Sequence, residues 1–248
     1  MTTPTPSLAI ALSGGLDSFL AVHWALAQGR VPQAIWINLG QPYASKEYEA
    51  IKSFDMPVRI IECEVLKREY ANLPTEENQI IPGRNALLTH ISLMYADETW
   101  ISALDGEMHL YQVDKNQAFF DGATKFFSQV FGTPKFVKTP FADKTKAELV
   151  KWALENGITA AHMADTVTCY HPTRKACGRC SACGKRAIAM VLNGIHEKHD
   201  TSPWDSFWMK GYIAKIIEAV ATGQHGHYSK KRCDETLAAL KLAGVPSA

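Results

Sequence analysis

Short segments with strand character alternate with amphipathic stretches along most of the chain. The strand-like segments, of the kind that a sheet buries on both faces, lie at 8–12, 34–39, 58–63, 99–104 and 135–138. The spacing of apolar residues predicts helices over 18–28, 43–54, 85–96, 119–131 and 145–156. Asn85 is a favoured N-cap residue and is expected to begin the third helix. The alternation predicts right-handed βαβ units and therefore an α/β fold with a doubly wound, parallel five-stranded sheet.

The pattern changes after residue 200. Ser202-Pro203-Trp204-Asp205 has the form of a capping box with proline at the first helical position, which predicts a helix from there to Thr222. A second helix is predicted over 229–242. Trp204, Phe207 and Trp208 suit a helix packing face, either in the core or in a homodimer interface, and a homodimer is expected. The end of the chain is therefore predicted to be a helical tail.

Composition and charge exclude several classes of protein. The 26 basic and 25 acidic residues leave a net charge of +1, so direct nucleic-acid binding is not expected. No run of 18 apolar residues occurs, so no membrane span is expected. Residues 1–6 lack a basic region followed by an apolar one, so the sequence predicts no secretory signal and a cytoplasmic location.

The turn between the first predicted strand and the first predicted helix is the first candidate for chemistry. Its residues, which follow Leu12, are Ser13, Gly14, Gly15, Leu16, Asp17 and Ser18. The glycines allow a tight turn and a close approach to a ligand, while N–H groups at the helix start converge on an anion. The alternative is a glycine-rich turn that serine merely caps. The residue types and the position between strand and helix favour a phosphate site.

Asp17 sets this loop apart from other phosphate loops. A carboxylate repels phosphate unless it holds a cation such as Mg²⁺, which neutralises the phosphate charges. The loop is also not a Walker A motif, because no Gly-Lys-Ser/Thr follows it. We therefore expect phosphate groups bound together with Mg²⁺.

Four of the six cysteines form a second motif. They are Cys169, Cys177, Cys180 and Cys183, separated by seven, two and two residues. Four thiolates at this spacing can reach one tetrahedral Zn²⁺, and a site with four protein ligands is structural because no position stays open. The alternatives are a redox or sulfur-carrying C-x-x-C pair and an iron–sulfur cluster.

The loop is similar to the pyrophosphate-binding signature of the N-type ATP pyrophosphatases. Together with the cysteine motif, it resembles the 7-cyano-7-deazaguanine synthase family of that superfamily. The resemblance covers residues 8 to 190 and rests further on Gly40-Gln41, 47–50, 82–85, Thr139-Pro140, 145–150 and 168–170. It implies an adenine nucleotide α-hydrolase-like fold, with a nucleotide-binding domain at 1–165 and a zinc-binding, helical region at 166–248.

The resemblance also implies a reaction. In that family ATP adenylates 7-carboxy-7-deazaguanine, ammonia captures the adenylate as an amide, and a second ATP drives dehydration to the nitrile. Asp17, Arg84 and Lys146 are the candidate catalytic residues: Arg84 for the substrate carboxylate or a phosphate, and Lys146 for phosphate charge. Gln41 is a candidate for the nucleotide and Asn85 for the substrate. A solvated arginine, an ordinary helix lysine, a turn glutamine and a cap asparagine are the alternatives.

The segment that should read the deazapurine departs from the family. Where the family carries Cys and Arg after its aspartate, residues 113–123 have neither, and only Asp114 and Asp121 can be aligned. These two carboxylates are the candidates for the guanine-like edge. The departure leaves two alternatives open: a divergent enzyme for a related deazapurine or a tRNA base, and a non-catalytic module that binds zinc and nucleotide.

Overall fold

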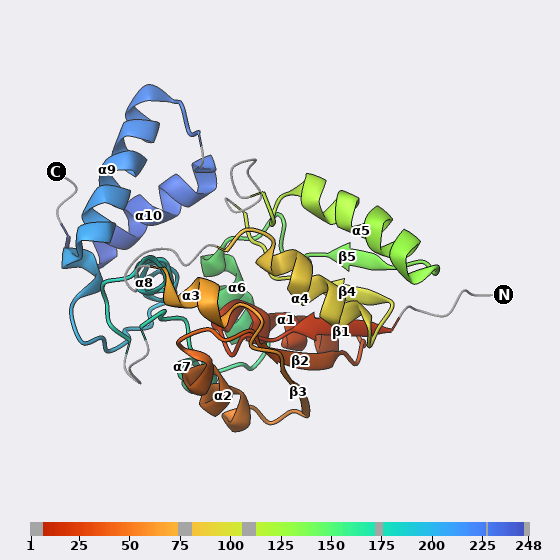
Figure 1. Ribbon diagram of the computed structural model, residues 1–248. Coiled ribbons are helices and arrows are strands. Elements are labelled where there is room, and N and C mark those ends of the chain that lie inside the picture. The colour runs from red at the N-terminus through yellow and green to blue at the C-terminus, as the bar shows by residue number, and fades with distance from the viewer. Residues whose placement is uncertain (1–6, 74–80, 106–112, 172–175, 227, 246–248) are drawn as a thin grey trace.

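The computed structural model describes residues 7–73, 81–105, 113–171, 176–226 and 228–245. Its sheet consists of β1 (Leu8–Ala11), β2 (Gln33–Asn38), β3 (Val58–Glu62), β4 (Glu98–Trp100) and β5 (Phe136–Lys138). The five strands are parallel and lie in the order β3-β2-β1-β4-β5 (Figure 1). The chain leaves β1 toward β2 and later returns to its other side as β4, so the loop after β1 lies at the switch point of the sheet.

Helices cover both faces of the sheet. Those of the α/β region are α1 (Leu16–Ala27), α2 (Ala44–Ser53), α3 (Lys67–Ala71), α4 (Arg84–Leu93), α5 (Gln117–Phe131), α6 (Lys146–Glu155) and α7 (Ala160–Ala164). Ile10 and Trp36 pack with α1, α2 and α6 on one face, while Ile35 and Ile37 pack with α3 and α4 on the other. Alternate residues of β2 thus serve opposite layers, which confirms the doubly wound α/β fold.

Two predicted helix starts are wrong. α4 begins at Arg84 with Gly83 as its N-cap, so Asn85 lies inside the helix, where it is buried. Gly83 occupies this position because its φ of 78° favours a residue without a side chain. Pro203–Asp205 form a separate 3₁₀ turn, and Ser206 accepts a hydrogen bond from Met209 N to cap the next helix.

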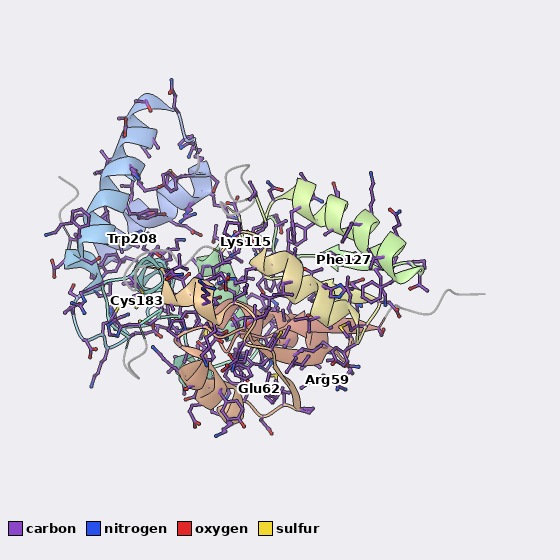
Figure 2. All side chains as sticks on the ribbon, viewed as in Figure 1. Arg59, Glu62, Lys115, Phe127, Cys183 and Trp208 are labelled. Atoms are coloured by element: carbon purple, nitrogen blue, oxygen red, sulfur yellow. The ribbon has the colours of Figure 1, made fainter. Side chains whose placement is uncertain are left out.

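The helical tail is confirmed and rests on a helix that the sequence patterns did not predict. α8 (Ser181–Leu192) leads from the cysteine motif, followed by α9 (Phe207–Thr222) and α10 (Lys230–Leu242). A Cβ on Gly184 of α8 would lie 2.4 Å from the ring of Trp208, so only glycine permits this close contact with α9. Figure 2 shows Trp208 at the base of α9, close to Cys183. In the described part of the chain, no helix is both long and apolar enough to cross a membrane.

Candidate active site

The predicted phosphate loop connects β1 to α1 at the carboxyl edge of the sheet. Gly14 has a φ of +67°, and a Cβ there would lie 3.0 Å from the backbone oxygen of Glu47. Ser18 Oγ accepts a hydrogen bond from Ser13 N at 3.0 Å and donates one to Gly15 O at 3.1 Å. No side chain caps the N-terminus of α1. The helix N–H groups are therefore directed at the loop, as an anion site requires.

Asp17 and Lys146 meet beside this loop. Lys146 Nζ lies 2.5 Å and 2.6 Å from the two carboxylate oxygens of Asp17. The side chains are only 26% exposed for Asp17 and 15% for Lys146, so the pair is sheltered from solvent. The structure thus brings together two of the three predicted catalytic residues. A divalent cation and phosphate groups would give each of them a new partner of opposite charge.

Arg84 faces the same cleft from the start of α4. Its Nη1 donates to the hydroxyl of Tyr70 at 3.4 Å. Although burial disfavours the charge, the phenols of Tyr70 and Tyr43 hold the pKa of Arg84 above its usual value. Tyr43 also contacts Tyr170 of the cysteine motif, with 5.9 Å between ring centroids. This wall of aromatic residues around a fixed cation suits a flat, anionic ligand.

Gln41 and Glu47 form a buried pair below that wall. Gln41 Nε2 donates to Glu47 Oε2 at 2.7 Å, and Gln41 Oε1 accepts from Leu39 N at 2.8 Å. Trp36 Nε1 also donates to Glu47, at 3.1 Å. The amide of Gln41 therefore supports the turn after β2, and its predicted contact with nucleotide stays a prediction. Burial raises the pKa of the Glu47 carboxyl to about 7, despite the hydrogen bonds from Gln41 and Trp36 that lower it.

This raised pKa gives a testable dependence of stability on pH. The folded protein holds a proton on Glu47 that the unfolded chain, with a carboxyl pKa of 4.5, has released, so stability falls as pH rises from 4.5 to about 7. Glu47→Gln stays neutral and keeps an acceptor for Trp36 and Gln41. Chemical denaturation should show the variant close to wild type at pH 5 and more stable by roughly 3 kcal/mol at pH 8.5. The exposed Glu49→Gln on the same helix is the control, and an equal difference at both pH values would contradict the ionisation of Glu47.

The two candidate substrate carboxylates have different surroundings. Asp121 is exposed on α5, where its Oδ1 accepts from Gln117 Nε2 at 2.8 Å, and it is not among the residues that line the cleft. Asp114 is half-buried, and its backbone oxygen accepts from the buried Asn85 Nδ2 at 3.1 Å. Asn85 thus fixes the segment that carries Asp114 and brings the next residue, Lys115, into the lining of the cleft.

One cleft of about 230 Å³ is lined by the loop, by positively charged side chains and by part of the cysteine motif. The charged side chains that line it are Asp17, Glu47, Arg84, Lys115, Lys146 and Lys185 (Lys115 is labelled in Figure 2). Four cations thus face two carboxyl groups, and burial keeps one of these, Glu47, partly protonated. Sequence patterns missed Lys115 and Lys185, because a lysine in a loop or on a helix carries no signal of the cleft it faces. The excess of positive charge suits phosphates and a carboxylate.

The four motif cysteines come together as predicted. Their Sγ atoms lie within 4.8 Å of one another, and all four side chains are buried. The Cys177–Cys183 separation is 4.0 Å, twice the length of a disulfide bond and close to the edge of about 3.8 Å in a tetrahedral zinc–sulfur site. The cluster can therefore hold a metal ion. The donor set and its burial suit a structural Zn²⁺.

Arg186 of α8 links this cluster to the phosphate loop. Its guanidinium donates to Glu197 Oε1 at 2.7 Å and to Thr166 Oγ1 at 2.7 Å, and it reaches Thr168 Oγ1 at 2.9 Å. Between these threonines, Val167 N donates to Gly14 O at 2.8 Å. The segment 166–168, which leads into the cysteine motif, therefore also forms one side of the phosphate loop.

A doubly wound, parallel α/β sheet with a glycine-rich loop at its switch point, beside a buried four-cysteine cluster that can hold a metal ion, defines the class of protein. Within that class the chain belongs to the queuosine biosynthesis protein QueC family, whose model matches residues 8–194. It is similar to the 7-cyano-7-deazaguanine synthase of Hahella chejuensis, with 28% identity over 217 residues, 77% of this chain and 92% of that protein. The synthases of Acetivibrio thermocellus (28% over 211 residues, 75% and 93%) and Marinobacter nauticus (25% over 214 residues, 77% and 95%) are also similar. The resemblance noted in the sequence is thereby confirmed.

Proposed function

We propose that this protein is an ATP-dependent synthase that converts 7-carboxy-7-deazaguanine and ammonia into 7-cyano-7-deazaguanine. The observation that carries the proposal is the Asp17–Lys146 pair at the phosphate loop, in one cleft with Arg84. The membership in the QueC family and the names of the relatives support this choice of substrate.

The charge of each group in the cleft would determine which part of the substrates it binds. The loop N–H groups bind the pyrophosphate of ATP, and Lys146 neutralises part of its charge. Asp17 would hold Mg²⁺, which would neutralise the phosphates further. Arg84 holds the substrate carboxylate so that one of its oxygens can attack the α-phosphorus. Pyrophosphate leaves into the loop, and the carboxylate becomes a mixed anhydride with AMP.

Ammonia then completes the conversion in two stages. It attacks the activated carbonyl carbon, and AMP leaves together with a proton to give the amide. A second ATP activates the amide oxygen, and loss of AMP together with both amide protons forms the nitrile. Two pyrophosphates are therefore released for each nitrile. The aromatic side chains of Tyr43, Tyr70 and Tyr170 line the cleft and would exclude water from the activated acid.

Zn²⁺ at the four cysteines would have a structural part in this scheme. It would fix the segment of Cys169 that borders both the cleft and the phosphate loop. Of the two carboxylates predicted to bind the edge of the deazapurine, Asp114 is closer to the cleft than Asp121, because its neighbour Lys115 lines the cleft. An Asp114→Ala variant should raise the KM for the deazapurine and leave the KM for ATP unchanged, whereas equal effects on both would remove Asp114 from base recognition.

Pyrophosphate release by the purified full-length chain tests the proposed function. We expect release only when 7-carboxy-7-deazaguanine is present, and nitrile formation only when ammonium is added. Glutamine should not replace ammonium, because the sheet, the cysteine motif and the tail account for the described chain and leave no glutaminase domain in it. The matched control is 7-deazaguanine, which lacks the carboxylate. Release that ignores the carboxylate, or none at all with the acid, would contradict the proposal.

A divergent substrate is the second candidate. The observation in its favour is the segment from Val113 to Lys125, where the family's Cys and Arg are replaced and Lys115 faces the cleft. Such an enzyme would bind ATP with the same loop and adenylate a related deazapurine acid or a tRNA base. Tight ATP binding without turnover of 7-carboxy-7-deazaguanine would favour this candidate over the first.

A further inference from the structure

The N-terminus of α6 places Lys146 beside the phosphate loop. Thr145 caps this helix through a reciprocal capping box, in which Thr145 Oγ1 accepts from Glu148 N at 3.2 Å and Glu148 Oε2 accepts from Thr145 N at 2.9 Å. Lys146 is the first residue of the helix, and its Nζ lies 2.5 Å from Asp17. Any shift of the cap therefore moves the lysine that the phosphates would meet.

α10 of the tail contacts this cap directly. The Thr145 hydroxyl, while it accepts from Glu148, donates its single proton to Glu235 Oε1 at 2.5 Å. Lys231 lies one helical turn earlier, where its Nζ pairs with Glu148 Oε2 at 2.5 Å and donates to Asp143 O at 3.2 Å. Both members of the capping box are thus held by side chains from a helix about 90 residues further along the chain.

Of the two contacts, the hydrogen bond between Thr145 and Glu235 matters more than the ion pair between Glu148 and Lys231. Thr145 is only 4% exposed, so its bond to Glu235 is shielded from water. Lys231 and Glu148 are 42% and 37% exposed, and solvent screens such a pair. Burial raises the pKa of the Glu235 carboxyl, and the negative charges of Glu148 and Asp105 act in the same direction, while Thr145 and Lys231 lower it.

Polar contacts, more than apolar packing, fix α10 against this end of α6. A cavity of about 50 Å³ lies between the two helices, and the side chains of Lys146, Lys185, Arg232 and Glu235 line it. The apolar contacts of the tail are made instead with α8, through residues such as Ile188 and Met209. Loss of the Glu235 contact would therefore free the cap of α6 without unpacking the tail.

We propose that Glu235 is a positioning residue which, through Thr145, holds Lys146 in place for the phosphates of ATP. The expected effect on kcat rests on the proposed function, whereas the expected effect on ATP affinity rests on the phosphate loop alone. α10 begins at Lys230, beyond residues 8–194 that the family model matches, so the family model does not cover this contact. The tail is thereby a part of the enzyme.

The full-length chain and four substitutions test the proposal. Glu235→Ala should lower kcat for pyrophosphate release and weaken ATP binding in calorimetry, each on the order of 10-fold, because the lysine loses its alignment. Glu235→Gln keeps an acceptor for Thr145 and should restore most of both. Asp234→Ala, on the exposed side of α10, is the matched control and should resemble wild type. In a Lys146→Ala background, Glu235→Ala should add no further loss.

The outcomes separate this proposal from the proposed function. Additive losses in the Lys146→Ala background, equal losses for Asp234→Ala, or unchanged ATP affinity in Glu235→Ala would overturn the positioning role. A fall in melting temperature that Glu235→Gln does not restore would assign Glu235 to folding alone and would also overturn it. If 7-carboxy-7-deazaguanine is not turned over while ATP affinity still shows the coupling of Glu235 and Lys146, the proposed substrate fails and the positioning role stands.

Discussion

Replacing Asp17 by Asn should reduce pyrophosphate release by at least about 100-fold, because the charge that neutralises the phosphates is lost at the point of transfer. Asn retains the size of the side chain and one acceptor for Lys146, so the loop can keep its geometry. The carboxylate is 26% exposed, pairs with Lys146 at 2.5 Å and lines the cleft that the proposal assigns to the nucleotide. Steady-state pyrophosphate release over a range of Mg²⁺ concentrations is the measurement.

Two controls make this result specific to the site. Asp55→Asn removes an exposed carboxylate in the turn before β3 and should leave release unchanged. The melting temperature of Asp17→Asn should stay near that of wild type, since Asn maintains the contact with Lys146. Near-normal turnover of the Asp17 variant at saturating Mg²⁺ would show that this carboxylate is outside the reaction.

Most of the architecture of the α/β region could be predicted because its strands and longer helices each carry an apolar pattern, whereas the five-residue helices α3 and α7 are too short to carry one and were missed. β2, for example, is apolar on both faces and can serve only a sheet covered on both sides. One error is the end of β4, which stops at Trp100 although an apolar strand was predicted as far as Leu104. Other errors lie at helix starts, where a favoured residue type competes with backbone geometry. Asn85 is a good cap in general, but Gly83 adopts the left-handed conformation that this turn needs, and Asn85 is used to bind Asp114 O instead.

The candidate site divides in a similar way between local and long-range features. The loop from Ser13 to Ser18 and the four cysteines each lie within a short stretch of the sequence, so residue types and spacing alone were enough to predict that each forms a local cluster. Lys185 enters the site through the packing of α8, and no local pattern marks such a residue. The bond between Thr145 and Glu235 spans 90 positions and depends on how the tail docks. Only the structure supplies these contacts.

The cysteine cluster should hold about one Zn²⁺ per chain, and Cys177→Ser should lose most of it. Four buried sulfur atoms that meet within 4.8 Å supply the donor set of a tetrahedral zinc site, and as thiolates they would repel one another without the charge of the metal. Apparent binding of structural zinc contributes about 10–16 kcal/mol in small peptides, so loss of one ligand should lower stability by several kcal/mol. Elemental analysis of the metal and thermal melting are the measurements.

The damage should extend from the metal to the phosphate loop. Cys169 follows Thr168, which Arg186 holds, and the adjacent Val167 bonds to Gly14 of the loop. A loosened cluster should therefore weaken ATP binding as well. Removal of zinc from the wild-type protein with a chelator should weaken ATP binding by the same factor. Cys63→Ser, at an exposed cysteine away from the cluster, is the matched control and should keep its zinc, its melting temperature and its affinity for ATP. A Cys177→Ser protein that stays folded and metal-loaded would refute the structural site. Iron with acid-labile sulfide in the wild-type protein would show that the cysteines hold an iron–sulfur cluster and not zinc.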